Sequence, residues 1–281
     1  MLTVQAPAKI NLVLEVLGKY DDNHHQIYSI LQAINLCDTL NFQLAEEVVF
    51  KCSEPGLERS NLVVEAVTAL KEVTGCNKGV RIELLKHIPW GMGLGGGSSD
   101  AAATLLALNK LWKLKLPIAE LTDLAAKLGS DVPFFVYGGT ALVEGRGERI
   151  TLLPSLSPTC FVLLVPQLPK IPDKTKKLYE KLGDEHYSKG QFVRKALPSL
   201  IQERRLDPAF MFNVFEKVIF DVSPELRKYR EEFREAGADN IHLAGAGPAL
   251  FTLVRTRRAN ELCSRLKRQG LECYMTTIFR G

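Results

Sequence analysis

The chain has 281 residues, of which 46% are apolar and 24% charged. This composition excludes intrinsic disorder and supplies enough apolar residues for one large domain or two smaller ones, of which we expect two. The formal net charge of +4 suits an anionic small ligand and is weak evidence for nucleic-acid binding.

The six cysteines are scattered without a C-x-x-C pair. We therefore expect buried thiols in a reducing compartment rather than a zinc ribbon or a redox pair. The N-terminus lacks the pattern of a secretory signal, and no apolar run reaches membrane-spanning length. We expect a cytoplasmic protein without a membrane partner.

The N-terminal part is predicted to be rich in strands. Partial alternation of apolar residues from Leu2 to Val16, broken at Pro7, indicates two strands or one bent strand, with Lys9 just after the break. Apolar segments over 28–40 and 40–52 continue this pattern.

Helical spacing over 62–70 then predicts a helix that starts at Ser60 or Asn61 and ends near Gly75, and alternation over 80–84 predicts a further strand. Beyond residue 117 the chain alternates between helical and strand patterns, which predicts an α+β fold of mixed or antiparallel sheets packed with helices. The prolines and serines of 154–158 are the best linker, so we place the domains at 1–154 and 155–281. The expected elements are a helix over 118–128, a short helical segment from Asp131 with Pro133 in its first turn, a hairpin over 140–153, strand 161–165, helices 175–182, 224–236 and 259–269, and strands 241–243, 249–254 and 272–278.

Five glycines within seven positions separate the strand at 80–84 from a helix expected to begin at Ser98. Such a loop can turn sharply and direct its N–H groups at one point, and the helix start adds its own unpaired N–H groups, so the pattern predicts a phosphate cradle. A simple turn with a serine cap is the less favoured alternative. The loop comprises Gly91, Gly93, Leu94, Gly95, Gly96 and Gly97, followed by Ser98 and Ser99.

The same loop formally matches the dinucleotide-binding pattern G-x-G-x-x-G, which makes an oxidoreductase the first rival interpretation. The preceding strand alternates instead of being wholly apolar. The nearest acidic residue past Asp100 is Glu120, which lies at the start of a predicted helix and does not suit a ribose-binding acid. The loop also lacks the Gly-Lys-Ser/Thr ending of a P-loop.

Four segments, taken in order, resemble the GHMP small-molecule kinase superfamily. Within it they are similar to the member that serves the non-mevalonate route to isoprenoid precursors. The resemblance implies a two-domain kinase with its active site in the interdomain cleft. It would transfer the ATP γ-phosphoryl group to the tertiary 2-hydroxyl of a methylerythritol linked to cytidine diphosphate. The segments are Pro7–Leu12, Gly93–Ala102, Leu128–Phe135 and Gly139–Glu148.

The resemblance also implies residue roles. Lys9 and Asp131 match the catalytic pair, and Asn11 matches a polar position beside them. Phosphoryl transfer needs positioning, charge neutralisation and an acceptor for the hydroxyl proton, which suits both residues. The simpler interpretations are a helix cap for Asp131 and a charge on an edge strand for Lys9.

For the cytidine end, the resemblance points to His25 as the reader of the base edge and to Tyr179 as a stacking ring, with Thr175 on the same helix face. Two departures stand out. His24 replaces the family's usual tyrosine, and Ala246 replaces a serine in Gly245–Gly247.

Magnesium is expected to accompany ATP. Its ligands are unknown, Ser99 being a weak candidate and Glu144 a weaker one. Two rivals remain open: an RNA-binding module, motivated by the basic clusters 174–177 and 255–258, and mevalonate or homoserine kinase activity within the superfamily.

Overall fold

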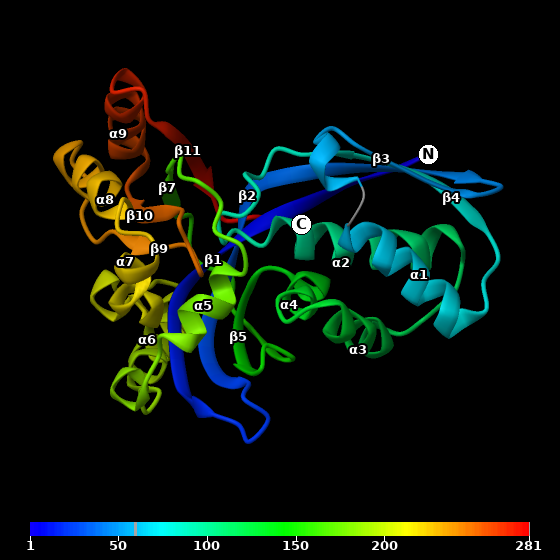
Figure 1. Cartoon of the computed structure of the whole chain (residues 1–281), viewed down its shortest axis with the longest axis horizontal. Helices are drawn as coiled ribbons and strands as arrows, with labels where there is room; N and C mark the ends of the chain where they lie inside the picture. The colour runs from blue at the N-terminus through cyan, green and yellow to red at the C-terminus, as the bar shows by residue number, and fades with distance from the viewer. Residues whose placement is uncertain (59–60, 281) are drawn as a thin grey trace. The chain divides into compact units, whose positions relative to one another are not determined.

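The computed structural model describes residues 1–58 and 61–280, and these fold into two compact units (Figure 1). Unit 1 contains Met1–Ala8, Leu36–Trp90 and Gly95–Gly138. Unit 2 contains Lys9–Asn35, Gly91–Leu94 and the chain from Gly139 onward. Two long strands, β1 (Leu2–Lys19) and β2 (His25–Ala45), contribute residues to both units. The sequence-based boundary between residues 154 and 155 stays a prediction.

In unit 1, strands pack against helices through one apolar face. In β4 the even-numbered residues from Val80 to Leu84 are buried and the odd-numbered ones are exposed, as alternation predicted. This strand runs antiparallel to the last part of β2, with Thr39 opposite Leu85, and parallel to β3. The elements of the unit, besides its parts of β1 and β2, are β3 (Val48–Cys52), η1 (Pro55–Leu57), α1 (Leu62–Thr74), β4 (Gly79–Leu85), α2 (Gly96–Leu111), α3 (Ile118–Leu128) and α4 (Val132–Tyr137).

Capping residues set the ends of α1, as predicted. The Asn61 side chain accepts a hydrogen bond from the Val63 amide at 3.0 Å, and Gly75 ends the helix in the left-handed conformation. The alternative cap, Ser60, lies outside the described residues. No described helix has the length and apolar character needed to cross a bilayer.

Unit 2 contains a four-stranded antiparallel sheet in the order β11-β7-β10-β9, whose central strand β7 is buried throughout. β5 and β6 form the hairpin that was predicted over 140–153, and β5 also pairs with the first part of β2. The elements are β5 (Thr140–Gly145), β6 (Arg149–Leu153), β7 (Cys160–Val165), α5 (Lys174–Glu180), η2 (Asp184–His186), α6 (Gln191–Glu203), η3 (Pro208–Phe210), β8 (Phe212–Asn213), η4 (Val214–Lys217), α7 (Ile219–Val222), α8 (Leu226–Glu235), β9 (His242–Leu243), β10 (Leu250–Val254), α9 (Thr256–Arg268) and β11 (Glu272–Thr277).

Several elements differ from expectation. The helix α6, which holds Pro198 in its interior, was not predicted. The helix α2 begins at Gly96 instead of Ser98, because Gly95 ends the loop in the left-handed conformation and no serine caps the helix. β1 is a single strand, and β8 pairs with it only at Val13 and Leu14. At Lys9 the backbone is bonded to the glycine-rich loop instead of to β8, since the Lys9 amide donates to the Leu94 carbonyl at 2.9 Å. All six cysteines are free thiols, four of them buried.

Candidate active site

The glycine-rich loop uses its glycines for conformation and for close approach. Gly91, Gly93 and Gly95 have φ angles of 78°, 81° and 73°, a region that side chains disfavour. A Cβ at Gly93 would lie 2.8 Å from the amide nitrogen of Gly247. Two glycine segments of unit 2, 91–94 and 245–247, therefore pack backbone to backbone, and larger residues would push them apart.

Lys9 lies against both of these segments. A Cβ at Gly245 would come within 2.7 Å of both the Lys9 Nζ atom and the Gly93 carbonyl oxygen. The Lys9 amide donates to the Leu94 carbonyl at 2.9 Å, and the Lys9 ammonium donates to Asn11 Oδ1 at 2.7 Å. The ammonium is thus held beside the glycine-rich loop.

Asn11 is fixed in turn by Ser29. Its Nδ2 group donates to the Ser29 hydroxyl at 2.9 Å, and that hydroxyl donates to the Val13 carbonyl at 2.6 Å. Lys9, Asn11 and Ser29 are all buried. This chain of hydrogen bonds fixes the amide of Asn11 so that its oxygen faces the lysine.

Asn213, the last residue of β8, supports the 245–247 segment. Its Nδ2 group donates to the carbonyls of Leu243 and Gly245, and its Oδ1 accepts from the Phe215 amide. Glu216 accepts from the Leu243 amide at 3.0 Å. No catalytic role is predicted for this region from the sequence, because the segment 213–216 resembles a family segment whose acid it lacks.

The start of α2 in unit 1 holds two buried polar atoms without a partner among the described residues: the hydroxyl of Ser99 and Oδ1 of Asp100. Each of these residues is 1% exposed. Buried polar atoms without hydrogen bonds are rare in native proteins, so their presence at a helix start suits a ligand that donates or carries a cation.

Lys86, which no sequence pattern indicated, contacts the start of α2 through Asp100. Its ammonium contacts Oδ2 of Asp38 and, at 2.8 Å, Oδ2 of Asp100. The other oxygen of Asp38 accepts from the amides of His87 and Ile88 at 2.6 and 2.8 Å. We call Asp38, Lys86 and Asp100 the buried triad.

Burial shapes the protonation of the buried triad. It raises the pKa of Asp100 to about 7, an effect that outweighs the attraction of the Lys86 ammonium. The two carboxylates in turn raise the pKa of Lys86 against the lowering effect of its own burial. Lys86 therefore stays charged, and Asp100 is the member that exchanges a proton near neutral pH.

Asp131 lies in unit 1 at the residue before α4, where a cap would stand. Its side chain accepts no capping hydrogen bond from that helix. The simpler interpretation as a helix cap is therefore wrong. Lys9 belongs to unit 2 and Asp131 to unit 1, and their action on one reacting group stays a prediction.

His25 and Tyr179, which the resemblance assigns to the cytidine end, lie together in unit 2. Their rings stack with centroids 4.7 Å apart, and the Tyr179 ring also packs edge-on against Phe215 at 4.9 Å. Burial and the nearby Lys19 lower the pKa of His25, which favours the neutral imidazole. A neutral ring has one donor and one acceptor nitrogen, the pair needed to read a base edge.

Thr175 and His24, the two other residues considered for the cytidine end, are both exposed. Thr175 lies on α5 with Tyr179 but is exposed. His24 is 62% exposed and pairs with Asp22 at 3.2 Å. The described rings that pack on His25 are those of Tyr179 and, edge-on at 6.1 Å, Tyr187. Glu144, the weaker magnesium candidate, faces Arg149 across the hairpin at 4.0 Å.

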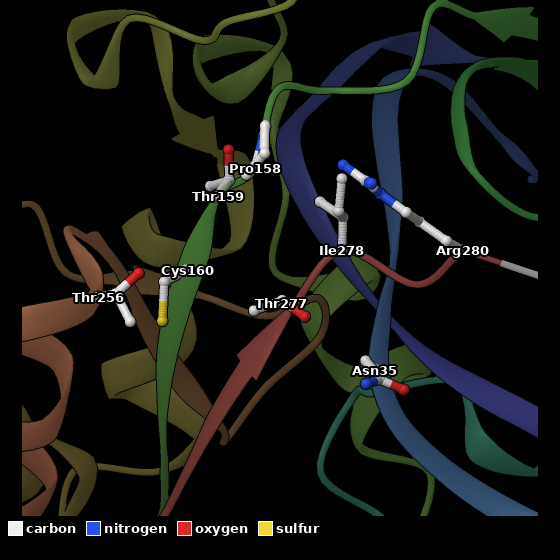
Figure 2. Close-up of a pocket in the computed structure, with 8 residues that line it drawn as sticks. All are labelled: Asn35, Pro158, Thr159, Cys160, Thr256, Thr277, Ile278 and Arg280. Carbon is white, nitrogen blue, oxygen red and sulfur yellow. The ribbon is translucent and has the colours of Figure 1, made fainter.

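One cavity of unit 2 lies away from these residues (Figure 2). It has a volume of about 420 Å³ and opens where the ends of β7 and β11 approach β2 and the start of α9. No residue predicted to belong to the catalytic or binding site lines this cavity, so the cavity is separate from the candidate site. Its lining residues are Asn35, Pro158, Thr159, Cys160, Thr256, Thr277, Ile278 and Arg280.

Comparison with known proteins gives consistent matches along the chain. The model of the GHMP kinases N terminal domain matches residues 61–139, and that of the GHMP kinases C terminal domain matches residues 193–272. The chain is 46% identical over 279 residues to a 4-diphosphocytidyl-2-C-methyl-D-erythritol kinase of Dehalococcoides mccartyi, covering 99% of this chain and 98% of that protein.

A second relative of the same name, from Gloeobacter violaceus, is 38% identical over 281 residues, covering 97% of this chain and 92% of that protein. A crystal structure titled as 4-(cytidine 5'-diphospho)-2C-methyl-D-erythritol kinase matches all of both chains with a TM-score of 0.84 and 33% identity. A homoserine kinase structure from Cytophaga hutchinsonii, at 18% identity and a TM-score of 0.75, covers 99% of this chain and 94% of that one and shares the fold.

Proposed function

The chain belongs to the 4-diphosphocytidyl-2-C-methyl-D-erythritol kinase family of GHMP kinases, and we infer that it transfers the γ-phosphoryl group of ATP to the 2-hydroxyl of that cytidyl substrate. This conclusion rests on the relatives that match the chain over nearly its full length. The interpretation of the glycine loop as the dinucleotide-binding site of an oxidoreductase is not supported, because the relatives that match the whole chain are kinases. Mevalonate and homoserine kinases are supported only by the shared fold.

We assign the glycine-rich loop and the start of α2 to the ATP phosphates. The loop offers backbone N–H groups free of side chains, and a helix start carries unpaired N–H groups and the positive end of the helix dipole. These groups would hold the triphosphate with its γ-phosphorus toward the acceptor. No P-loop lysine is needed, because Lys9 supplies the positive charge.

Lys9 and Asp131 are proposed as the reacting pair. The Lys9 ammonium would neutralise charge on the transferring group, and Asn11 holds it in place at 2.7 Å. Asp131 would accept the proton of the 2-hydroxyl as that oxygen bonds to the γ-phosphorus and ADP leaves. His25 and Tyr179 would hold the cytosine ring, the imidazole at its edge and the phenol ring at its face.

Magnesium fits the start of α2. Among the described residues no group of three or more His, Cys, Asp or Glu side chains could hold a metal, which excludes an all-protein cage there. Mg²⁺ bound to ATP needs only one or two protein oxygens, and the unpartnered Ser99 hydroxyl is a hard oxygen donor of that kind. When bound, the ion neutralises the β- and γ-phosphate oxygens.

The test is ADP release with each candidate acceptor. We expect release to depend on 4-diphosphocytidyl-2-C-methyl-D-erythritol, and equal rates with mevalonate or homoserine would refute the assignment. D131N should keep the ATP affinity while turnover drops by roughly two to four orders of magnitude. D123N, an exposed carboxylate change on α3, is the matched control.

A double variant tests whether the pair acts together. If Lys9 and Asp131 serve the same step, K9M/D131N should lose scarcely more turnover than the worse single variant. Losses that multiply would mean that the two residues act independently, and the pairing would then be wrong.

A further inference from the structure

Lys174, the first residue of α5, makes a contact that the proposed mechanism does not use. Its ammonium donates to the carbonyl of Gly91 at 3.0 Å and to the carbonyl of Gly247. One carbonyl belongs to the glycine-rich loop and the other to the 245–247 segment. A single side chain therefore bridges the two segments that also enclose Lys9.

Besides the Lys174 bridge, the two glycine segments contact each other through backbone atoms. The Ala249 amide donates to the Met92 carbonyl at 3.2 Å, and Gly93 packs on Gly247. Glycine segments have many accessible conformations, and such contacts leave them free to shift. A charge-assisted bond to a carbonyl on each side restricts both segments at once.

The chemistry of Lys174 is unusual for a lysine at a helix start. Burial lowers its pKa to about 8, and no charged side chain of the described part of the chain contributes to that shift. The ammonium has carbonyl oxygens for partners instead of a carboxylate. These two carbonyl oxygens hold the half-buried ammonium, although a positive charge near a helix N-terminus is itself unfavourable.

The same short helix carries Tyr179, whose ring stacks on His25. From this arrangement we propose that Lys174 is a positioning residue that couples the cytidyl-binding helix to the ATP loop, so that each ligand strengthens binding of the other. The proposal rests on the proposed function. It extends that function by naming how the two substrate sites communicate within unit 2.

The experiment measures binding and kinetics in K174M, K174R and K176M, the last being an exposed lysine on the same helix. The dissociation constant of a non-hydrolysable ATP analogue is measured with and without the cytidyl substrate, and coupling is the ratio of the two. We expect the wild type and K176M to show the same coupling ratio above 1. K174M should abolish it and lower kcat by about 10- to 100-fold through misplacement.

K174R separates positioning from mere loss of structure, because arginine keeps a charge and donors at that point. We expect it to restore part of the coupling and to keep it above pH 8, where the wild-type lysine loses its proton and its coupling. Unchanged coupling in K174M, or equal losses in K174R and K174M at every pH, would overturn the proposal. A wild type inactive on the cytidyl substrate would instead overturn the proposed function, so the two failures are distinguishable.

Discussion

Removing the Lys86 ammonium is the sharpest perturbation that unit 1 offers. The substitution K86M keeps the length of the side chain and leaves two carboxylates, Asp38 and Asp100, buried without their cation. Their side chains are 0% and 1% exposed, so water cannot replace the lost partner. Breaking a buried ion pair in this way costs about 3–5 kcal/mol of unfolding free energy, a large share of the roughly 5–15 kcal/mol typical of a folded protein.

The cost should depend on pH. The carboxylates of K86M can escape the penalty by binding protons, and burial already raises the pKa of Asp100 to about 7 in the wild type. Without the ammonium that pKa rises further, so the variant binds more protons in the folded state than in the unfolded state. Its deficit should therefore be largest near pH 8 and shrink by up to about 1.4 kcal/mol per pH unit on acidification.

Urea unfolding followed by tryptophan fluorescence suits this test. Both tryptophans of the chain, Trp90 and Trp112, belong to unit 1, so the signal reports on the unit that holds the buried triad. K228M, which breaks an exposed pair with Glu232 on α8, should change the free energy by less than about 0.5 kcal/mol. A K86M deficit below about 1 kcal/mol, or one that is the same at pH 6 and pH 8, would refute the reasoning.

Three further outcomes are expected. As pH rises from 4 to 7, the unfolding free energy of D100N should increase relative to that of the wild type, as measured by urea titration. The wild type loses the stability contributed by protonated Asp100 over that window, whereas D100N does not. A difference in unfolding free energy that stays constant with pH would contradict the raised pKa. Y179A should raise KM for the cytidyl substrate by about 5- to 150-fold in steady-state assays and leave KM for ATP nearly unchanged, whereas equal changes would remove the ring from the base site. G245A should cut kcat/KM by about 100-fold, because its Cβ would meet Lys9 Nζ at 2.7 Å, while G18A, which has open space, should retain wild-type kinetics.

The glycine loop and most elements could be predicted because their signals are local. Helix α3 begins and ends at the predicted residues, Ile118 and Leu128, since helical spacing and a following glycine define it. The assignment of both His25 and Tyr179 to the cytidine end came from the resemblance alone, because no periodicity links residues 154 positions apart in the chain. That their two rings stack on each other was not predicted.

The buried triad could not be found this way, because its partners are distant in sequence: Asp38 and Lys86 are 48 residues apart. A signal exists in retrospect. Each of these charges follows an apolar strand segment, and the antiparallel register that pairs Thr39 with Leu85 brings the two charges together. Lys174 gave no such signal, since the basic cluster around it resembled a solvated helix face.

The division of β1 and β2 between the units has a consequence for synthesis on the ribosome. Every segment of unit 1 has been translated once residue 138 is made, whereas Lys9–Asn35 must wait for partners that follow Gly139. A nascent chain halted soon after residue 138 should thus gain protease resistance in the earlier unit, while its lysine-bearing segment is still digested. Neither unit corresponds to an uninterrupted stretch of messenger RNA, so no simple truncation would yield either one alone.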